Sequence, residues 1–527
     1  MKQPPSPHLS RMTTPLGAIV AGVVVIALVT GSLVVRPSKE LVQKPIIEDG
    51  YYSFTVARNI AAGKGITIDG VTPTNGFQPL FTFITVPIFR WTGGERLESI
   101  RYVLFIHWAV FLLAGLLLGV VMRDAFGGVD PRLRRELFWI TGFTYLASVL
   151  LFLLSFNGLE TGFLLFMTIV VLRYFQKTGA ETLGQTILLG ALLGLVVLVR
   201  IDQSFLVVVL ALFLFWRDRH RSFLLAARKA LLLGLTTFVV SLPWWWYNWS
   251  TFGSLMPTSG SAQQDWHVGW DRVGSGLSAA SKVLMPLVYA GAGQYEGILE
   301  DVLRLTLIIG FILLVRGGGT VFHQQSTGDV QPDSLRRRTI HFAVIILAVN
   351  LLLLAWYVLS SFASWFYVRY VATAAVVASL LIAGTVLHLC RQRRWIMWVY
   401  VAVGVLPLCA SVVLLHLGRA YNQYHDVQCR LVEEFVPPGE LVAARQTGTL
   451  GYFRDHIVNL DGKVNPEAYR ARSTLREYLR QKEVRWLCDW EWMIADLVEP
   501  TPSVQGRWQC VARRGEFVLY HFEASPR

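Results

Sequence analysis

Two adjacent carboxylates, Glu48 and Asp49, follow the first long apolar stretch of the chain. Like charges this close raise each other's proton affinity, and that effect suits a general base, a group that takes the proton from an attacking hydroxyl. Arg58 lies in the same stretch, which is also rich in aromatic residues and glycine. A solvated loop with ordinary charges needs no such composition, so the stretch is expected to be an ordered loop that carries chemistry.

Three more sets of polar residues stand at the ends of apolar stretches. An ionisable side chain costs about 2.5–3.5 kcal/mol at the centre of a membrane helix and less near its end, so such residues usually face the interior of a helical bundle and have a function. An Arg–Asp ion pair, or an arginine that reaches the lipid headgroups within a belt of aromatic residues, would account for these residues without a catalytic role. The three sets are Asn157 and Glu160 in NGLETG, Arg200 and Asp202 in LVRID, and Arg369 in SFASWFYVRY.

Together these residues predict an outward-facing cavity that contains carboxylates, arginines and aromatic rings. An arginine binds a phosphate through two parallel hydrogen bonds. Aromatic rings stack on sugars and line lipid grooves, and a carboxylate can deprotonate an acceptor hydroxyl. A sugar linked to a lipid through phosphate is a substrate that uses all three.

The elements that hold these residues are predicted to cross a membrane. The chain has 527 residues, of which 54% are hydrophobic and only 16% are charged, and its mean hydropathy is +0.47. The apolar residues fall in blocks of about 20, the length that spans a hydrocarbon core. The net charge of +13 does not indicate a nucleic-acid partner, because much of the Lys and Arg lies in short loops between apolar blocks, where basic residues report membrane topology.

We expect about eleven transmembrane spans within residues 1–417, which form a mainly α-helical, polytopic bundle in the plasma membrane. Every arginine cluster between spans then falls on the cytoplasmic side, as the positive-inside rule requires. The first outer loop, residues 36–101, carries the acidic pair, and its short apolar segment 79–92 is expected to be interfacial or re-entrant. The expected spans are 16–35, 102–122, 137–155, 162–175, 184–199, 204–216, 230–247, 302–316, 340–360, 370–390 and 396–416.

Residues 418–527 are predicted to form a small α/β domain outside the cytoplasm. Strand-like segments alternate there with an amphipathic helix that begins with proline, and this alternation is typical of α/β domains. An oxidising location would allow one disulfide, for which Cys488 and Cys510 are the expected pair. The strands are expected at 439–446, 456–460, 484–490 and 515–522, and the helix at 466–482.

The chain resembles the GT-C superfamily of membrane glycosyltransferases. The segments that carry the resemblance are EDGYYSFTVARNIAAGKG, TNGFQP, NGLETG and LVRID, with TGTLGYF and VNLDGKVN in the C-terminal region. The nearest likeness is to the bacterial branch that contains cell-wall arabinofuranosyltransferases and mannosyltransferase-like proteins. The resemblance extends over nearly the whole chain and implies a polyprenyl-phosphate sugar as the donor.

The resemblance also implies roles for single residues. In the superfamily an acidic residue of the first outer loop acts as the base, which corresponds to Asp49 or Glu48 here. Some members bind a divalent metal near the site, and no ligand spacing in this sequence decides whether this chain does. The superfamily holds the donor phosphate with arginines, but no motif fixes which, so the arginines that follow are inferred from their placement. The residues expected to bind substrate are Arg58, Asn75, Gln78, Glu160, Arg200, Asp202 and Arg369.

The sequence therefore predicts an inverting glycosyltransferase that moves a sugar to a cell-envelope glycan, lipid or protein on the outer face of the membrane. A transporter or lipid flippase is one alternative, but it would favour inverted repeats and polar residues near the bilayer midplane. A glycan ligase or polymerase with a pyrophosphate-linked donor is the other, and it would favour one very large central outer loop. In this chain the charged residues stand at the outer ends of spans, and the first outer loop carries the acidic pair.

The charge-based topology can be tested with reporter fusions. A reporter that is active only outside the cytoplasm is expected to work at residue 527, and a cytoplasmic reporter is expected to work when inserted within 317–339, because the arginines of that loop should stay inside. Reporter activity in whole cells, normalised to the amount of fusion protein, gives the measurement. The opposite pair of results would overturn the placement of the site on the outer side.

Overall fold

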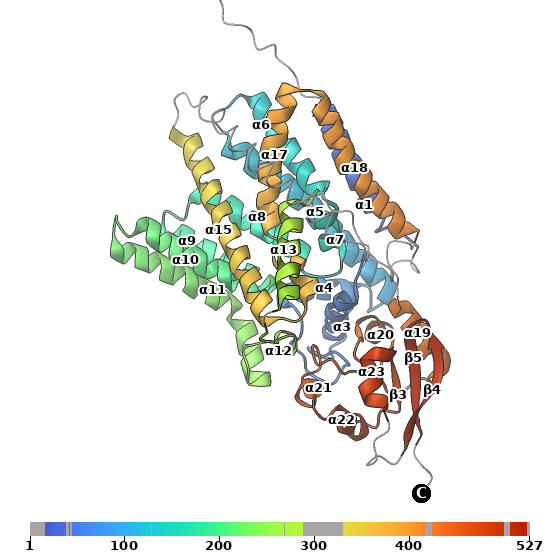
Figure 1. Cartoon of the computed structure of the whole chain (residues 1–527). Helices are drawn as coiled ribbons and strands as arrows, with labels where there is room; N and C mark the ends of the chain where they lie inside the picture. The colour runs from blue at the N-terminus through green and yellow to red at the C-terminus, as the bar shows by residue number, and fades with distance from the viewer. Residues whose placement is uncertain are drawn as a thin grey trace, which may run out of the picture.

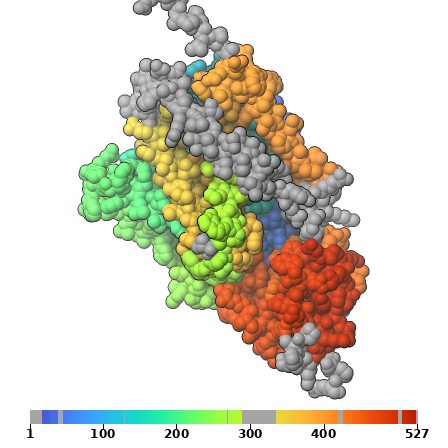
Figure 2. Space-filling view, in the orientation of Figure 1, coloured from blue at the N-terminus to red at the C-terminus, as the bar shows by residue number. Residues whose placement is uncertain are grey.

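The computed structural model describes residues 16–37, 42, 45–127, 129–267, 269–287, 330–417, 424–499 and 506–523. Inclined helices form the larger part of the molecule, and the C-terminal residues form a smaller part with strands at one end of the helices (Figure 1). The space-filling view shows the C-terminal residues, in red, packed against that end (Figure 2). The fold is therefore mainly α-helical, as the sequence predicts.

Long apolar helices identify an integral membrane protein. Five helices among the described residues are long and apolar enough to cross a membrane. The pair α6 (Pro131–Leu146) and α7 (Val149–Phe156) passes the same test only when taken together, and a bend of 61° separates its two members. The five single helices are α5 (Arg96–Ala125), α11 (Phe223–Phe252), α15 (Val330–Ser360), α17 (Ala374–Gln392) and α18 (Trp395–His416).

The described helices do not confirm the expected count of about eleven spans. Helices α1 (Leu16–Gly31) and α9 (Leu183–Val199) are apolar but contain 16 and 17 residues, which at about 1.5 Å per residue fall short of a hydrocarbon core of about 30 Å. Helices α8 (Thr161–Thr178) and α10 (Ser204–Asp218) occupy expected spans without meeting the criteria of length and hydropathy. The expected span 302–316 lies outside the described residues.

Local signals in the sequence place the helix ends around the bend. Helix α6 begins with Pro131 after Asp130, whose carboxylate accepts the backbone N–H of Arg132 at 3.1 Å. An N-cap followed by a first-turn proline is a common helix start. At the bend, the hydroxyl oxygen of Ser148 accepts the N–H of Leu151 at 3.1 Å and starts α7. Helix α7 then leads into the NGLETG turn, from which α8 returns along α5.

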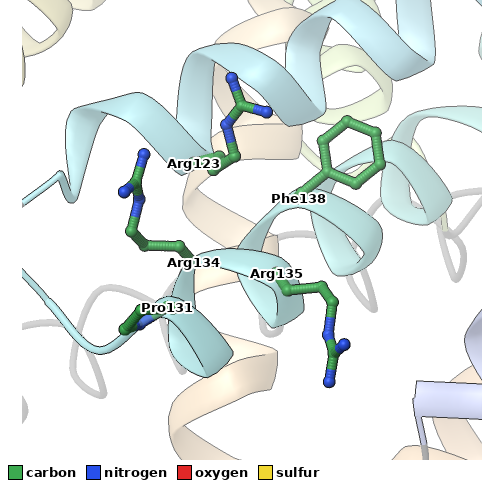
Figure 3. Close-up of a pocket in the computed structure, with 5 residues that line it drawn as sticks. All are labelled: Arg123, Pro131, Arg134, Arg135 and Phe138. Carbon is green, nitrogen blue, oxygen red and sulfur yellow. The ribbon is translucent and has the colours of Figure 1, made fainter.

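Arginines gather at the end of the helices that lies away from the C-terminal part, which we call the arginine end. The carboxylate of Asp124 receives Arg123 at 2.7 Å, Arg134 at 3.7 Å and Arg173 at 2.5 Å. A close-up of this end shows Arg123 and Arg134 pointing the same way and Arg135 pointing the other way (Figure 3). The other ion pairs of the arginine end are Arg338–Glu181, Arg221–Glu181 and Arg391–Glu136. The arginine clusters of four expected cytoplasmic loops thus meet at one end of the bundle.

Residues 36–101, expected as one outer loop, contain two helices of their own. Helix α3 (Glu48–Ala61) begins at the acidic pair. Helix α4 (Pro79–Trp91) has 13 residues, starts at a proline and contains Pro87. At about 1.5 Å per residue it is too short to cross a membrane, which fits the expected interfacial or re-entrant segment. From residue 45 onward the described part of this loop is ordered, as its aromatic and glycine content predicts.

The C-terminal part is built on a five-stranded sheet of order β2-β1-β3-β5-β4. Strand β1 pairs in parallel with β2 and β3, whereas β5 pairs antiparallel with β3 and β4. Helices accompany these strands, as expected of an α/β region. The elements are α19 (Tyr424–Phe435), β1 (Val442–Ala444), α20 (Gly448–Phe453), β2 (Ile457–Asn459), α21 (Pro466–Arg470), α22 (Leu475–Gln481), β3 (Trp486–Trp490), α23 (Glu491–Val498), β4 (Arg507–Arg514) and β5 (Phe517–Glu523).

Two sequence-based predictions for this region are wrong. The single helix expected at 466–482 is two helices, α21 and α22, separated by a turn that contains Ser473 and Thr474, residues that favour turns over helix interiors. The expected disulfide is absent, because Cys488 and Cys510 are free. Cys488 lies on β3 and Cys510 on β4, with β5 between them. Two strand spacings amount to about 9–10 Å, beyond the reach of a disulfide, about 7 Å between Cα atoms.

Candidate active site

The acidic pair forms the first turn of α3. Carboxylates in a first turn are stabilised by the helix dipole, which accounts for a helix that starts at Glu48 and Asp49 without a side-chain cap. The N–H of Ile47 donates to a carbonyl of the NGLETG turn at 3.0 Å. Gly50 lies so near this turn that a Cβ on Gly50 would stand 3.0 Å from the carbonyl oxygen of Gly158. Glycine at position 50 therefore lets the two motifs touch.

A cavity of about 370 Å³ lies where the helices meet the C-terminal part. Its wall comes from α3, the segment before α4, the NGLETG turn, the segment from Arg200 into α10, the end of α15, the segment around α12 (Thr258–Ala262), α16 (Tyr367–Tyr370) and Lys463 of the C-terminal part. Most of the site residues predicted from the sequence line this cavity, namely Asp49, Gln78, Glu160, Arg200, Asp202 and Arg369.

Asp49 faces the cavity and pairs with a lysine from the C-terminal part. The Nζ atom of Lys463 lies 3.7 Å from Asp49 Oδ1 and 3.5 Å from Asp461 Oδ2. Burial lowers the pKa of Lys463, but the two carboxylates outweigh burial and hold this pKa above its usual range. Burial also raises the pKa of Asp461, an effect that Lys463 offsets only in part. Lys463 is therefore a protonated cation in the cavity wall.

Glu48 points away from the cavity, into the C-terminal part. Its carboxylate accepts the backbone N–H of Gly448, the N–H of Thr449 at 3.0 Å and the hydroxyl of Thr449. The Nδ1 atom of His425 lies 3.6 Å from the same carboxylate. The acidic pair is thus divided: Asp49 lines the cavity, and Glu48 attaches the C-terminal part to α3. The two neighbouring carboxylates, of which the sequence predicts one to be the base, therefore face different surroundings.

Arg58 also lies outside the cavity. Its Nη1 atom donates to the carbonyl of Tyr452 at 2.6 Å, and its Nη2 atom lies 3.5 Å from Asp455. Arg96 makes a similar contact nearby, donating to the carbonyl of Phe453 at 2.7 Å. The expected substrate contact by Arg58 is not supported by this placement. The two arginines form a second attachment between the C-terminal part and the first outer loop.

The TNGFQP segment supplies one residue that lines the cavity and one that supports it. The Oδ1 atom of Asn75 accepts the N–H of Thr258 at 3.0 Å and its hydroxyl at 2.6 Å. Asn75 does not line the cavity itself. It bonds Thr258 at the start of α12, and the neighbours of Thr258, Pro257 and Ser259, do line the cavity. Gln78 lines the cavity, and its buried Oε1 atom has no hydrogen-bond partner among the described residues.

Arg200 is already neutralised by carboxylates. Its Nη2 atom lies 2.7 Å from Asp202 Oδ2, and its Nη1 atom lies 3.6 Å from Glu160 Oε1. The side chains of Arg200 and Glu160 are each only 3% exposed. The hydroxyl of Tyr357 donates to Asp202 at 2.7 Å. The Arg–Asp ion pair that the sequence left open is therefore present, and two carboxylates face one guanidinium.

Arg369 lines the cavity with hydrogen-bond donors that have no acceptor among the described residues. Within the described part of the chain, its Nε and Nη1 atoms are buried and have no hydrogen-bond partner. The guanidinium lies over the rings of Phe366 and Tyr370, 4.7 and 5.6 Å from their centroids. Tyr370 in turn stacks on Tyr357 at a centroid distance of 3.8 Å. Buried donors without a partner cost free energy, so this part of the cavity is suited to an anionic ligand.

Lys463 and Tyr52 are among the residues of the wall that sequence reasoning missed. Tyr52 lies one helical turn after the acidic pair, and its hydroxyl oxygen accepts the N–H of Thr447 at 3.3 Å. Both residues stand in segments that carry the GT-C resemblance. The adjacent opposite charges of the DGK sequence in VNLDGKVN were the signal that could have identified Lys463.

The residues of the cavity do not fit a resident divalent cation. In the part of the chain that the structure describes, no group of three or more His, Cys, Asp and Glu side chains is placed to hold a metal ion. The carboxylates of the wall face basic side chains instead, Asp49 that of Lys463 and the other two that of Arg200.

Comparison with known proteins gives a fold for the chain as a whole. Two structures of ArnT from Cupriavidus metallidurans are similar to it. The structure bound to undecaprenyl phosphate has a TM-score of 0.58 at 13% identity and covers 96% of this chain and 98% of its own. The structure in the apo state has a TM-score of 0.55 at 14% identity, with coverage of 95% and 97%.

The chain has the GT-C fold. The likeness to ArnT confirms the resemblance that the sequence motifs predict, and at 13% identity it establishes the fold alone. AglB from Archaeoglobus fulgidus, in complex with an inhibitory peptide and a dolichol-phosphate, is similar at a TM-score of 0.47 and 15% identity over 96% of this chain and 74% of its own. Residues 417–524 match a family described as a domain of unknown function, DUF8728. The sequence matches no curated protein.

The role of Glu48 as an attachment point can be tested with Glu48→Ala. Removing a charged acceptor from buried hydrogen bonds costs about 1–3 kcal/mol, so the C-terminal part should be released more readily. Limited proteolysis of the purified full chain, followed by the rate at which the C-terminal fragment appears, measures this. Glu467→Ala, which removes a surface partner of Lys482, is the matched control. Equal cleavage rates in the two variants would contradict the attachment.

Proposed function

We propose that this protein is a glycosyltransferase that moves a sugar from a polyprenyl-phosphate donor to an acceptor hydroxyl, with inversion at the anomeric carbon. The observation that carries the proposal is one cavity that contains both the carboxylate of Asp49 and the unpartnered donors of Arg369. A base and an anion-binding group in one cavity are what transfer from a phosphate-linked sugar needs. The GT-C fold and the undecaprenyl phosphate bound to ArnT support the same conclusion.

Asp49 is the proposed general base. Its carboxylate takes the proton of the acceptor hydroxyl while the hydroxyl oxygen forms a bond to the anomeric carbon of the donor sugar. Glu48 cannot serve equally well, because its oxygens are occupied by the donors at the start of α20. We therefore propose Asp49 rather than Glu48 as the base.

Arg369 is the proposed ligand of the donor phosphate. As the new bond forms, the bond between the anomeric carbon and the phosphate oxygen breaks, and the polyprenyl phosphate leaves with the electron pair. The free N–H groups of Arg369 donate to that phosphate and stabilise its charge. Phosphate is already a good leaving group, so the mechanism requires no general acid. It also has no step through a metal ion, since the donor set of the cavity does not fit one.

The remaining residues of the wall hold this arrangement in place. Arg200 joins Glu160 and Asp202 and also donates to the carbonyl of Arg369 at 3.2 Å. This contact fixes the backbone of the phosphate ligand, so Arg200 supports Arg369 rather than competing for the phosphate. The arginine end of the bundle then faces the cytoplasm, and the cavity and the C-terminal part face outward, where a cell-envelope glycan, lipid or protein would be the acceptor.

The proposed base is tested by Asp49→Asn, which keeps the size of the side chain and removes its charge. A general base contributes about 10²–10⁴-fold to a rate, so sugar transfer by the purified protein should fall by that order while undecaprenyl phosphate still binds. The assay uses a panel of pentoses and hexoses linked to undecaprenyl phosphate. Asp426→Asn, on the surface of α19 where Asp426 pairs with Arg430, is the control. Transfer at the wild-type rate by Asp49→Asn would refute the mechanism.

The two arginines should respond differently to alanine. Arg369→Ala loses a charge-assisted phosphate contact of about 1.5–3 kcal/mol, so the Kd for undecaprenyl phosphate should rise about 10–100-fold with little change in thermal stability. Arg200→Ala leaves two buried carboxylates unpaired, an effect of about 3–5 kcal/mol on stability, and should mainly lower the melting temperature. Titration calorimetry and thermal melts of detergent-purified protein measure the two effects. The reverse pattern would make Arg200 the phosphate ligand.

A further inference from the structure

The C-terminal part contributes a charged side chain to the cavity, although the family that matches residues 417–524 is described only as a domain of unknown function. We infer that this domain completes the active site and that its Lys463 is a positioning residue for Asp49. The inference deepens the proposed function and rests on it for the role of Asp49. The domain would thus take part in the reaction itself by directing the general base, in addition to any part it has in covering the cavity or binding substrate.

Lys463 is held in a short, tightly bonded loop after β2. The N–H of Lys463 donates to Asp461 Oδ1 at 2.8 Å, and the N–H of Gly462 donates to the side chain of Asn459 at 3.2 Å. Asn465 closes the loop by donating to the carbonyl of Asn459 at 2.9 Å. The backbone of the loop is thereby fixed, and the ion pairs with Asp49 and Asp461 direct the lysine side chain.

The first outer loop presses directly on this lysine. A Cβ on Gly76, in the TNGFQP segment, would stand 1.9 Å from the carbonyl oxygen of Lys463 and 2.9 Å from the Cα of Val464. Both distances are shorter than any side chain tolerates, so only glycine fits between the two segments. Two motifs far apart in the sequence therefore meet backbone to backbone at Lys463.

The same helix that carries Asp49 also fixes the domain. Glu48 bonds the start of α20, and the hydroxyl oxygen of Tyr52 accepts the N–H of Thr447. Asp49 lies between these two attachment points in the sequence. The distance from Asp49 to Lys463 is therefore set by contacts on both sides of Asp49.

The ammonium group of Lys463 stands between two carboxylates, those of Asp49 and Asp461. Its side chain is 19% exposed and that of Asp49 is 17% exposed, so solvent screens the pair only in part. Asp49 and Asp461 together raise the pKa of the lysine and keep it protonated, and the lysine holds the Asp49 carboxylate in one direction. A base must meet the acceptor hydroxyl in a productive geometry, so a fixed direction favours proton transfer.

Other titratable groups face Asp49 as well. They are Asp461 and Lys463 from the loop after β2, Tyr52 on the same helix and Tyr370 from α16, while Glu48 adjoins Asp49 but points into the domain. Tyr52 and Tyr370 have their pKa values raised, chiefly by burial, and stay neutral. The charges that act on Asp49 from the domain are therefore one cation and one anion, which can be removed separately.

The experiment compares Lys463→Met and Asp461→Asn in the purified full chain. Loss of the cation should leave the Asp49 carboxylate free to turn, so kcat should fall about 10-fold while KM for the donor changes little, because Asp49 meets the acceptor hydroxyl only in the reaction. Asp461→Asn keeps the cation beside Asp49 and should lower kcat less. Lys463→Arg should restore most of kcat, and Lys482→Met, a surface lysine of the same domain paired with Glu467, should leave it unchanged.

A second readout does not depend on sugar transfer. A water-soluble carbodiimide activates a carboxyl group, and an amine in contact with that group then displaces the activator to form an amide. Peptide mass spectrometry of the treated wild type should therefore find Asp49 joined to Lys463, and Lys463→Arg should give no such pair. Absence of the pair in the wild type, or a kcat of Lys463→Met equal to that of the wild type, would overturn the inference. The cross-link in a protein that transfers no sugar would instead refute the proposed function and leave the lysine–aspartate contact standing.

Discussion

The placement of the site depends on one interaction, the hydrogen bonding of the Glu48 carboxylate by the first turn of α20. A carboxylate that leaves water must be satisfied by donors or it destabilises the fold. Here two backbone N–H groups and one hydroxyl, all from residues 448–449, supply the donors. Because the next residue along the helix is Asp49, this attachment aims the second carboxylate into the cavity and brings the DGK turn of the C-terminal part against it.

Some of the described basic side chains of the cavity are paired with carboxylates and one is not, and this difference indicates what the cavity binds. Arg200 faces two carboxylates and Lys463 faces two more. Within the described residues, Arg369 keeps buried donors without partners. An anion that enters the cavity meets one guanidinium that is free to bind it and two cations that are already occupied. The same residue type thus has different roles at two positions because the neighbours differ.

Glycines at three motif positions allow the segments of the site to touch. Gly50 meets the NGLETG turn, Gly76 meets Lys463 and Gly448 meets Glu48, each at a distance that leaves little or no room for a side chain. Backbone contact places a neighbouring side chain more rigidly than a contact between two long side chains can, since it has fewer rotatable bonds. The cavity is therefore defined by backbone contacts between distant segments, and the reactive side chains extend from them.

The sequence by itself determined the class of the molecule and the segments of the site. Apolar blocks with basic loops predict a membrane-embedded helical bundle, and the motifs that contain Asp49, Glu160, Arg200 and the DGK turn meet in space. These features are local: hydrophobicity and charge act through the nearest residues. Other features were decided only by the tertiary structure. Glu48 bonds the C-terminal part while Asp49 lines the cavity, and Arg58 contacts the C-terminal part instead of the cavity. Strand β5 separates Cys488 from Cys510, and Lys463 lies in the cavity wall. Each depends on which partner a side chain meets across the fold, and a partner hundreds of residues away leaves no signal in the spacing of one chain.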